Sequence, residues 1–237
     1  MHAAYLKPVE PSEAAIRLRP ADRRFGPEPI RRRIRQGQPL FHEGDHAEYV
    51  YRIVSGVVRL TRMQQDGRRQ VISFGFPGDL VGLPDDDRHT TECEAITACD
   101  VVAHRCPHPT GSDRNPEMQR FLMDAALQEI RALQDHFLLL GRRLALEKTA
   151  AFLVLLLDRL SEPLGKCRAI RLPMNRTDIA DYLGLTPETV SRSFTELRGR
   201  RALALDDANT VIVLDPAQLS AIAEGGAYDP DFRRGAD

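Results

Sequence analysis

Hydrophobic and polar positions follow three different patterns along the chain, and each pattern predicts a different kind of structure. From about residue 30 to residue 106, short segments rich in β-branched residues are separated by glycines, which is typical of a small antiparallel barrel or jelly roll. Residues 113–144 carry apolar side chains at spacings of three and four, which is the periodicity of a helix. Short helical and strand-like segments follow. The patterns together predict an α+β protein with its sheet domain first.

The predicted strands of the first region are short and end at turns that contain glycine. They are Tyr49–Val54, Val57–Arg62, Val71–Phe76, Leu80–Leu83, Thr91–Ile96 and Val101–His104. Residues 1–28 show prolines and no clear periodicity, so we expect an extended arm there. The basic run 31–35 can contact phosphate, but an exposed strand or loop is the favoured interpretation.

The middle region predicts one long helix, with Asn115 as its cap and Pro116 at its first position. Its apolar positions, which continue to Leu144, form a coiled-coil-like seam about four heptads long. One interpretation is a helix packed on its own barrel. The length of the helix and its place between two domains favour self-association instead. The predicted dimer interface consists of Met118, Leu122, Ala126, Ile130, Leu133, Phe137 and Leu140.

Residues 174–201 predict a helix-turn-helix. Asn175 precedes a periodic run, and Asp178 follows three residues later, which approximates a capping box. Gly184 permits the left-handed backbone of a tight turn. Thr186 can then cap a second helix that has Pro187 at its first position, where a missing N–H costs nothing.

The second helix, from about Pro187 to Arg198, divides into a polar and an apolar face. Its polar stripe begins at the N-terminus, which is the end that enters a DNA major groove first. Arg192 can pair with guanine, Glu188 can accept from an exocyclic amine, and Ser191 can bond bases or phosphate. The predicted DNA contacts are Thr186, Pro187, Glu188, Thr189, Ser191, Arg192, Thr195 and Arg198.

The apolar face of the same helix carries Val190, Phe194 and Leu197, which can pack on the first helix. Ala202–Leu205 and Thr210–Leu214 then flank a polar turn, which predicts a hairpin wing. The alternative is an amphipathic helix pair in some other small helical domain. The order of helix, glycine turn, capped helix and hairpin makes that alternative the weaker one.

Composition sets limits on these interpretations. The chain has 237 residues, of which 42% are apolar and 28% charged, as in a soluble globular protein. No apolar run approaches the roughly 18 residues of a membrane span, and the N-terminus lacks the pattern of a secretory signal. Four widely spaced cysteines make no disulfide framework, so we expect a cytoplasmic protein. No constellation suited to catalysis is present, so no enzyme is predicted.

Charge is distributed unevenly although the net charge is only −1. Residues 145–201 hold ten Lys/Arg against seven Asp/Glu, whereas residues 36–112 hold seven against eleven. A locally basic domain beside an acidic one suits a protein whose DNA contact is confined to one face.

The whole pattern resembles the CRP/FNR-type transcription regulators over roughly residues 30–215. The motifs that carry the resemblance are Gly44-Asp45, residues 51–56, Gly78-Asp79, the stretch 137–160 and residues 184–192. The resemblance implies a β-roll like a cyclic-nucleotide-binding domain, a long dimerisation helix and a C-terminal winged helix-turn-helix. The Glu188…Ser191-Arg192 pattern is similar to the FNR/FixK version, which implies palindromes of the TTGAT…ATCAA kind.

The sensor region departs from two better-known relatives. In the cyclic-AMP-binding members, a Gly-Glu-Leu run and an Arg-Ser pair hold the ribose and phosphate. Here those places read Gly82-Leu83-Pro84 and His89-Thr90, so the cation for the cyclic phosphate is missing. Oxygen-sensing members need N-terminal cysteines, and this chain has none before Cys93. We therefore expect neither nucleotide sensing nor an iron–sulfur cluster.

Other cofactors have only loose candidates. Cys93, Cys99 and Cys106 can meet at one end of the barrel, but buried free cysteines are the commoner case. A haem would need a ligand pair, for which the candidates are His42, His46, His89, His104 and His136. We predict no cofactor and no metal. The alternative is a regulator whose barrel binds haem or another required effector.

The resemblance thus favours a FixK-like activator of microaerobic and anaerobic genes. Its implied partners are double-stranded DNA, a second copy of the chain and RNA polymerase, with no membrane association. The predicted divisions are an arm at 1–28, a β-roll at 29–112, a dimerisation helix at 113–144, a winged helix-turn-helix at 145–220 and a tail at 221–237.

Overall fold

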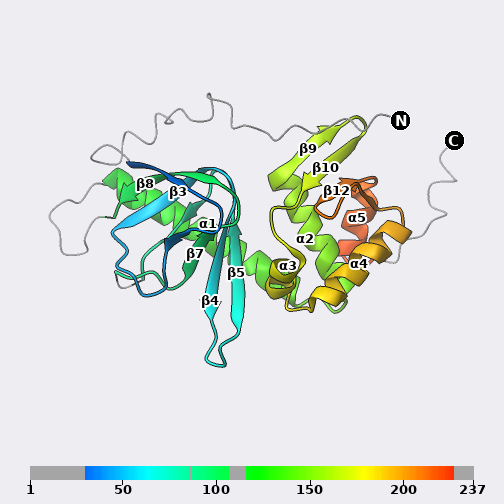
Figure 1. The fold of residues 1–237 in the computed structure, drawn as a ribbon, viewed down its shortest axis with the longest axis horizontal. Coiled ribbons are helices and arrows are strands. Elements are labelled where there is room, and N and C mark those ends of the chain that lie inside the picture. The colour runs from blue at the N-terminus through cyan, green and yellow to red at the C-terminus, as the bar shows by residue number, and fades with distance from the viewer. Residues whose placement is uncertain (1–29, 86, 107–115, 227–237) are drawn as a thin grey trace. The chain divides into compact units, whose positions relative to one another are not determined.

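The computed structural model describes residues 30–85, 87–106 and 116–226. It confirms the predicted α+β class, with an antiparallel β domain, a long helix and a helix-turn-helix domain in chain order (Figure 1). The described residues form two compact units. The first is drawn from residues up to 62 and from 72–127, and the second from 63–71 and from 128 onward. The predicted arm at 1–28 lies outside the described residues.

Two antiparallel four-stranded sheets make up the β domain. One sheet has the order β1-β8-β3-β6, and the other has the order β2-β7-β4-β5. The strands are β1 Ile30–Ile34, β2 Pro39–Phe41, β3 Tyr49–Ser55, β4 Val58–Met63, β5 Arg69–Gly75, β6 Leu80–Val81, β7 Glu92–Ala95 and β8 Cys99–Arg105. The basic run 31–35 lies largely on β1, an exposed strand at the edge of its sheet, as the favoured interpretation predicted.

The core of the β domain forms because alternate side chains of each strand point inward. Ile53 on β3, Val101 on β8 and Cys93 on β7 are at most 1% exposed. Gly56, at the turn between β3 and β4, has φ of +84°, and a side chain there would begin 2.3 Å from the carbonyl oxygen of Ala98. Only glycine therefore fits this turn.

The long helix α1 runs from Pro116 to Leu140 and ends four residues before the predicted boundary at 144. The predicted cap Asn115 lies outside the described residues. The prediction that Leu144 continues this helix is wrong, because the chain leaves α1 at Gly141 and Leu144 has extended backbone angles as the residue before α2. Glycine favours helix ends because it loses the most backbone entropy in a helix interior.

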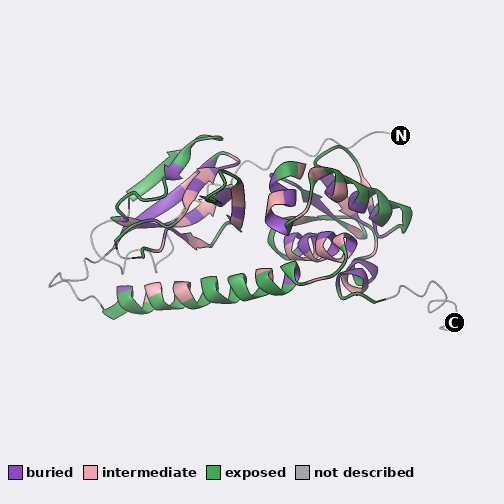
Figure 2. Cartoon of the chain, turned by 90° about the horizontal axis from the view of Figure 1, so that it is seen from below, coloured by how far each residue is buried: buried purple, intermediate pink, exposed green. Residues whose placement is uncertain are grey.

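The C-terminal domain packs three helices and a four-stranded sheet around α2. Its sheet has the order β11-β12-β10-β9. The elements are α2 Ala145–Leu160, β9 Ser161–Leu164, β10 Cys167–Arg171, α3 Arg176–Leu183, α4 Pro187–Gly199, β11 Leu203–Leu205, β12 Thr210–Val213 and α5 Pro216–Ala223. Figure 2 shows that α2 is largely buried, whereas α1 is exposed along most of its length.

Three elements of this domain, the strands β9 and β10 and the helix α5, were not among the predicted ones. The hairpin of β9 and β10 turns at Gly165, which has φ of +59°. Helix α5 crosses the predicted domain boundary at residue 220. Its start has a readable signal, since Asp215 accepts a hydrogen bond from the backbone N–H of Gln218 and Pro216 occupies the first helical position. Among the described residues, no helix is both long enough and apolar enough to cross a membrane.

Candidate DNA-reading surface

The turn between α3 and α4 is built by local backbone chemistry. Helix α3 begins where Asn175 Oδ1 accepts a hydrogen bond of 2.8 Å from the N–H of Asp178, which is the cap that the sequence predicted. The helix ends at Gly184, whose φ of 63° and ψ of 42° are left-handed. The N–H of Leu185 then donates to the carbonyl of Ala180 and closes the helix end. The chain can therefore start a second helix within two residues.

Helix α4 is also capped as predicted. Thr186 Oγ1 accepts from the N–H of Thr189 at 3.2 Å, and Pro187 stands at the first helical position. Val190 and Leu197 are fully buried and Phe194 is 2% exposed. These three side chains hold one face of α4 inside the domain. The opposite face must consequently lie on the surface.

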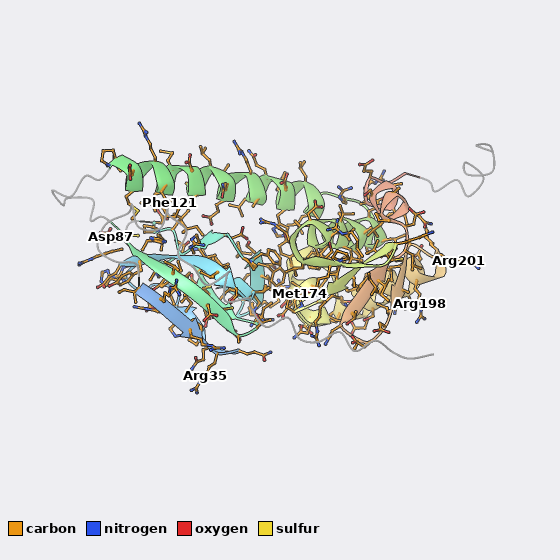
Figure 3. The ribbon with its side chains drawn as sticks, turned by 90° about the horizontal axis from the view of Figure 1, so that it is seen from above. Arg35, Asp87, Phe121, Met174, Arg198 and Arg201 are labelled. Atoms are coloured by element: carbon orange, nitrogen blue, oxygen red, sulfur yellow. The ribbon has the colours of Figure 1, made fainter. Side chains whose placement is uncertain are left out.

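The polar face of α4 carries the predicted contact residues. Glu188, Ser191, Arg192, Thr195 and Arg198 are all exposed, as is Thr186, while Pro187 and Thr189 are half-buried. Figure 3 shows Arg198 at the outer surface of the domain. The structure thus brings the predicted base-reading side chains together on one exposed stripe, which begins at a helix N-terminus.

Two hydroxyls on this stripe are oriented by the helix itself. Ser191 Oγ donates to the carbonyl of Pro187 at 2.9 Å, and Thr195 Oγ1 donates to the carbonyl of Ser191 at 3.0 Å. Each hydroxyl has one proton, and here that proton bonds the backbone. The lone pairs of both exposed oxygens remain available to accept a hydrogen bond.

The carboxylate of Glu188 is held ionised. Its pKa lies below the ordinary value because its own backbone N–H and the hydroxyl of Thr186 donate to it, with a further contribution from the charge of Arg192. The positive end of the helix dipole favours the same charge. Glu188 is therefore an acceptor at neutral pH, beside a guanidinium donor on the next turn.

Arg176 is a contributor to this surface that the sequence interpretation missed. Its guanidinium carbon lies 3.7 Å from the centre of the Phe194 ring, and Nη2 donates to the carbonyl of Ala208 at 3.2 Å. Burial lowers the pKa of Arg176. This one side chain joins α3, α4 and the turn between β11 and β12. Its position after the cap of α3 gave no signal for that role.

The turn between β11 and β12 is the predicted wing, and its tip is negatively charged. Asp207 Oδ1 accepts from the N–H groups of Asn209 and Thr210 at 2.6 and 2.7 Å. The N–H of Asn209 lowers the pKa of Asp207 most, followed by the hydroxyl of Thr210, which donates to Oδ2 at 3.0 Å, and by the N–H of Thr210. A carboxylate fixed at this place disfavours the close approach of a DNA phosphate.

The place where the resemblance implies a nucleotide pocket is filled by aromatic side chains. His89, which is 3% exposed, stacks on Phe41 with ring centres 3.8 Å apart, and Phe41 stacks on Tyr51 at 5.9 Å. A side chain at Gly82 would begin 2.9 Å from Phe41 Cε1. Burial lowers the pKa of His89, so the imidazole is neutral where a phosphate would need a cation.

In the described part of the chain, the cysteine candidates do not belong to any group of three potential metal ligands. Cys93 and Cys99 are buried, and no three of the described His, Cys, Asp and Glu residues are placed to share a metal ion. Burial raises the pKa of Cys106 to about 11. Of the five histidines named as haem candidates, His42 and His46 are exposed, His89 and His104 are buried, and His136 is half-buried on α1.

Comparison with known proteins agrees with this geometry. Residues 147–222 match the Crp-like helix-turn-helix domain, and residues 31–105 match the cyclic nucleotide-binding domain. The nitrogen fixation regulation protein FixK of Bradyrhizobium diazoefficiens is 40% identical over 79% of each chain. The chain belongs to the CRP/FNR family of transcription regulators.

Two further relatives place the chain within the CRP/FNR family. The transcriptional activatory protein AadR of Rhodopseudomonas palustris is 41% identical over 83% of each chain. The structure of FixK2 from Bradyrhizobium japonicum is similar with a TM-score of 0.74 and 33% identity, covering 85% of this chain and 98% of that one. FixK and AadR are named as regulators, which agrees with the prediction of a transcription regulator rather than an enzyme.

We expect Arg176→Met to destabilise the protein, because it removes both the contact with Phe194 and the hydrogen bond to the wing. A half-buried cation–π contact contributes about 0.5–2 kcal/mol. Urea unfolding should show a loss of about 1 kcal/mol for this variant, whereas the exposed control Arg198→Met should stay within about 0.5 kcal/mol of the unaltered protein. Equal stability of the two variants would show that Arg176 does not join these elements.

Proposed function

We propose that this regulator is FixK-like: a homodimer that binds palindromes of the TTGAT…ATCAA kind and activates transcription by RNA polymerase without an obligate effector. The main support for the proposal is the exposed stripe of Glu188, Ser191 and Arg192 on α4. It presents a carboxylate, an oriented hydroxyl and a guanidinium on one face of a helix, and these groups can bond base edges in a major groove. Relatives named for the regulation of nitrogen fixation support control of genes used under low oxygen.

Dimer formation is supported by an exposed apolar face on α1. Ile130, Leu133 and Phe137 are 51%, 44% and 76% exposed, and they border an open hollow of about 530 Å³ together with Gln134 and Leu138. Contiguous apolar surface of this kind marks an interaction site on a soluble protein. A palindromic operator requires a twofold protein, so the occupant we propose is the same face of a second copy.

The first residue of the predicted interface is not available to a partner. Met118 is 2% exposed within its own chain, so it offers no surface to a partner. Leu122 and Ala126 are half-buried, and Leu140 is 36% exposed. The apolar face that a second copy can cover is therefore centred on Ile130–Phe137, with Leu127 and Leu138 beside it.

Effector independence is supported by the aromatic stack inside the β domain. Phe41 and His89 occupy the space at the place where a nucleotide would need its cation, and the imidazole is neutral. A ligand can shift a conformational equilibrium only by binding one state better than the other. With this place filled by the chain's own side chains, the DNA-binding state does not depend on a nucleotide.

Arg192→Ala should abolish specific binding and leave non-specific binding in place. The lost bidentate contact to guanine costs about 1–3 kcal/mol, and a twofold dimer loses it at both half-sites. Affinities for a TTGAT…ATCAA duplex and for a scrambled duplex measure the effect. Arg192→Lys is the matched control for charge, because it keeps attraction to phosphate without the planar pair of donors. A small, equal loss on both duplexes would make Arg192 a phosphate contact only.

Leu133→Glu should give monomers, because it places an unpaired charge in an apolar interface. Light scattering measures the mass, and operator binding should be lost with the dimer. Gln128→Glu adds the same charge on the opposite face of α1 and should stay dimeric. A Leu133→Glu protein that remains a dimer would place the interface elsewhere.

Protein purified in air and free of coloured cofactor should bind its operator and activate transcription with RNA polymerase, and added cyclic AMP should change neither activity. The reason is that Phe41 and His89 leave the nucleotide no cation and no space. Footprinting and transcription in vitro measure the two activities. Binding that requires reconstitution with haem, with iron and sulfide or with a nucleotide would instead favour the alternative regulator with an effector in its barrel.

A further inference from the structure

A histidine on α1 makes a close contact with the helix-turn-helix. The rings of His136 and Tyr182 are parallel, with 3.9 Å between their centres and 4° between their planes. His136 belongs to the last two turns of α1, and Tyr182 belongs to the last turn of α3. Both residues lie in the second compact unit. The contact therefore joins the end of the long helix to the first helix of the DNA-reading motif.

The same histidine also bonds the backbone of α3. Nε2 of His136 lies 2.8 Å from the carbonyl oxygen of Tyr182. A carbonyl only accepts, so Nε2 must carry the proton. The last four carbonyls of a helix have no N–H donor within that helix. For the carbonyl of Tyr182, the donor is the imidazole of His136 on α1. Burial lowers the pKa of His136, so the ring is neutral at pH 7 and donates from this nitrogen.

Tyr182 itself is enclosed between elements. It is 7% exposed, and the ring of Phe152 on α2 lies at 5.5 Å from its ring at an angle of 51°. Burial raises the pKa of Tyr182 to about 12. Leu140 of α1 lies 3.8 Å from the point where a side chain at Gly184 would begin, in the turn that leads to α4. Helix α1 thus contacts both the last turn of α3 and the turn after it.

We propose that His136 is a positioning residue that sets the angle between α1 and the helix-turn-helix, and with it the distance between the two recognition helices of the dimer. A flat ring contact fixes tilt, and a hydrogen bond to a helix carbonyl fixes rotation about the stacking axis. Together they leave α4 one orientation relative to the helix through which two copies associate. The dimer belongs to the proposed function, whereas the fixed angle within one chain does not depend on it.

The consequence for DNA is discrimination between half-site spacings. Each inserted base pair moves a half-site by about 3.4 Å and turns it about the duplex axis, so a rigid dimer tolerates only one spacing. We expect His136→Ala to lose roughly tenfold in affinity for the native spacing. On duplexes with one or two base pairs inserted, it should bind as well as or better than the unaltered protein. His136→Phe, which keeps a ring but no donor, should be intermediate, and Gln128→Ala should be unchanged.

If His136 only stabilised the fold, His136→Ala would lower the affinity for all spacings by the same factor. An unchanged ratio of affinities between the native and the lengthened spacings would therefore overturn the proposal. If the unaltered protein binds no spacing of the TTGAT…ATCAA palindrome, the proposed operator is wrong.

A second measurement tests the positioning role without DNA. Spin labels at Arg131 on α1 and Thr195 on α4, diluted with unlabelled chain, report the distance within one chain.

The distance distribution should be narrow in the unaltered protein and in Gln128→Ala, and broad in His136→Ala. A distribution that stays narrow in His136→Ala means that other contacts hold the angle, which overturns the proposal. Should His136→Ala fail to fold, His136→Phe takes its place. We then expect a distance distribution broader than that of the unaltered protein, and an equally narrow distribution would overturn the proposal.

Discussion

The burial of one face of α4 decides which side chains the protein can offer to DNA. Val190, Phe194 and Leu197 lie in the core of the C-terminal domain, and the helix has no freedom to rotate without exposing them. Truncation of a buried phenylalanine costs about 3–5 kcal/mol, which is a large part of the stability of a domain. The buried face therefore fixes which side of α4 is exposed, and with it the positions along the helix of the carboxylate, the hydroxyl and the guanidinium.

Interactions of three physical kinds hold that helix in place. Backbone capping at Thr186 fixes where α4 begins, and apolar packing fixes its rotation. Arg176 adds a cation against the face of Phe194 and a hydrogen bond to the wing. Because the wing tip carries the ionised Asp207, its attachment keeps a negative charge at a defined distance from the reading helix.

The β domain matches the cyclic nucleotide-binding domain but has an aromatic stack in its core. In this chain Gly82 leaves room for Phe41 and His89 to stack in the core, at the place where the resemblance implies a cation for a cyclic phosphate. A buried imidazole resists protonation because desolvation penalises its charged form.

The sequence by itself determined the features that depend on local chemistry. The caps at Asn175 and Thr186, the turn at Gly184 and the two faces of α4 all follow from residues within one or two helical turns, and the structure confirms them. Tertiary structure alone decided that Met118 is buried, that Arg176 reaches Phe194 and Ala208, and that His136 stacks on Tyr182. Such contacts join residues up to 46 positions apart, and periodicity carries no information about which long-range neighbour a polar side chain will meet.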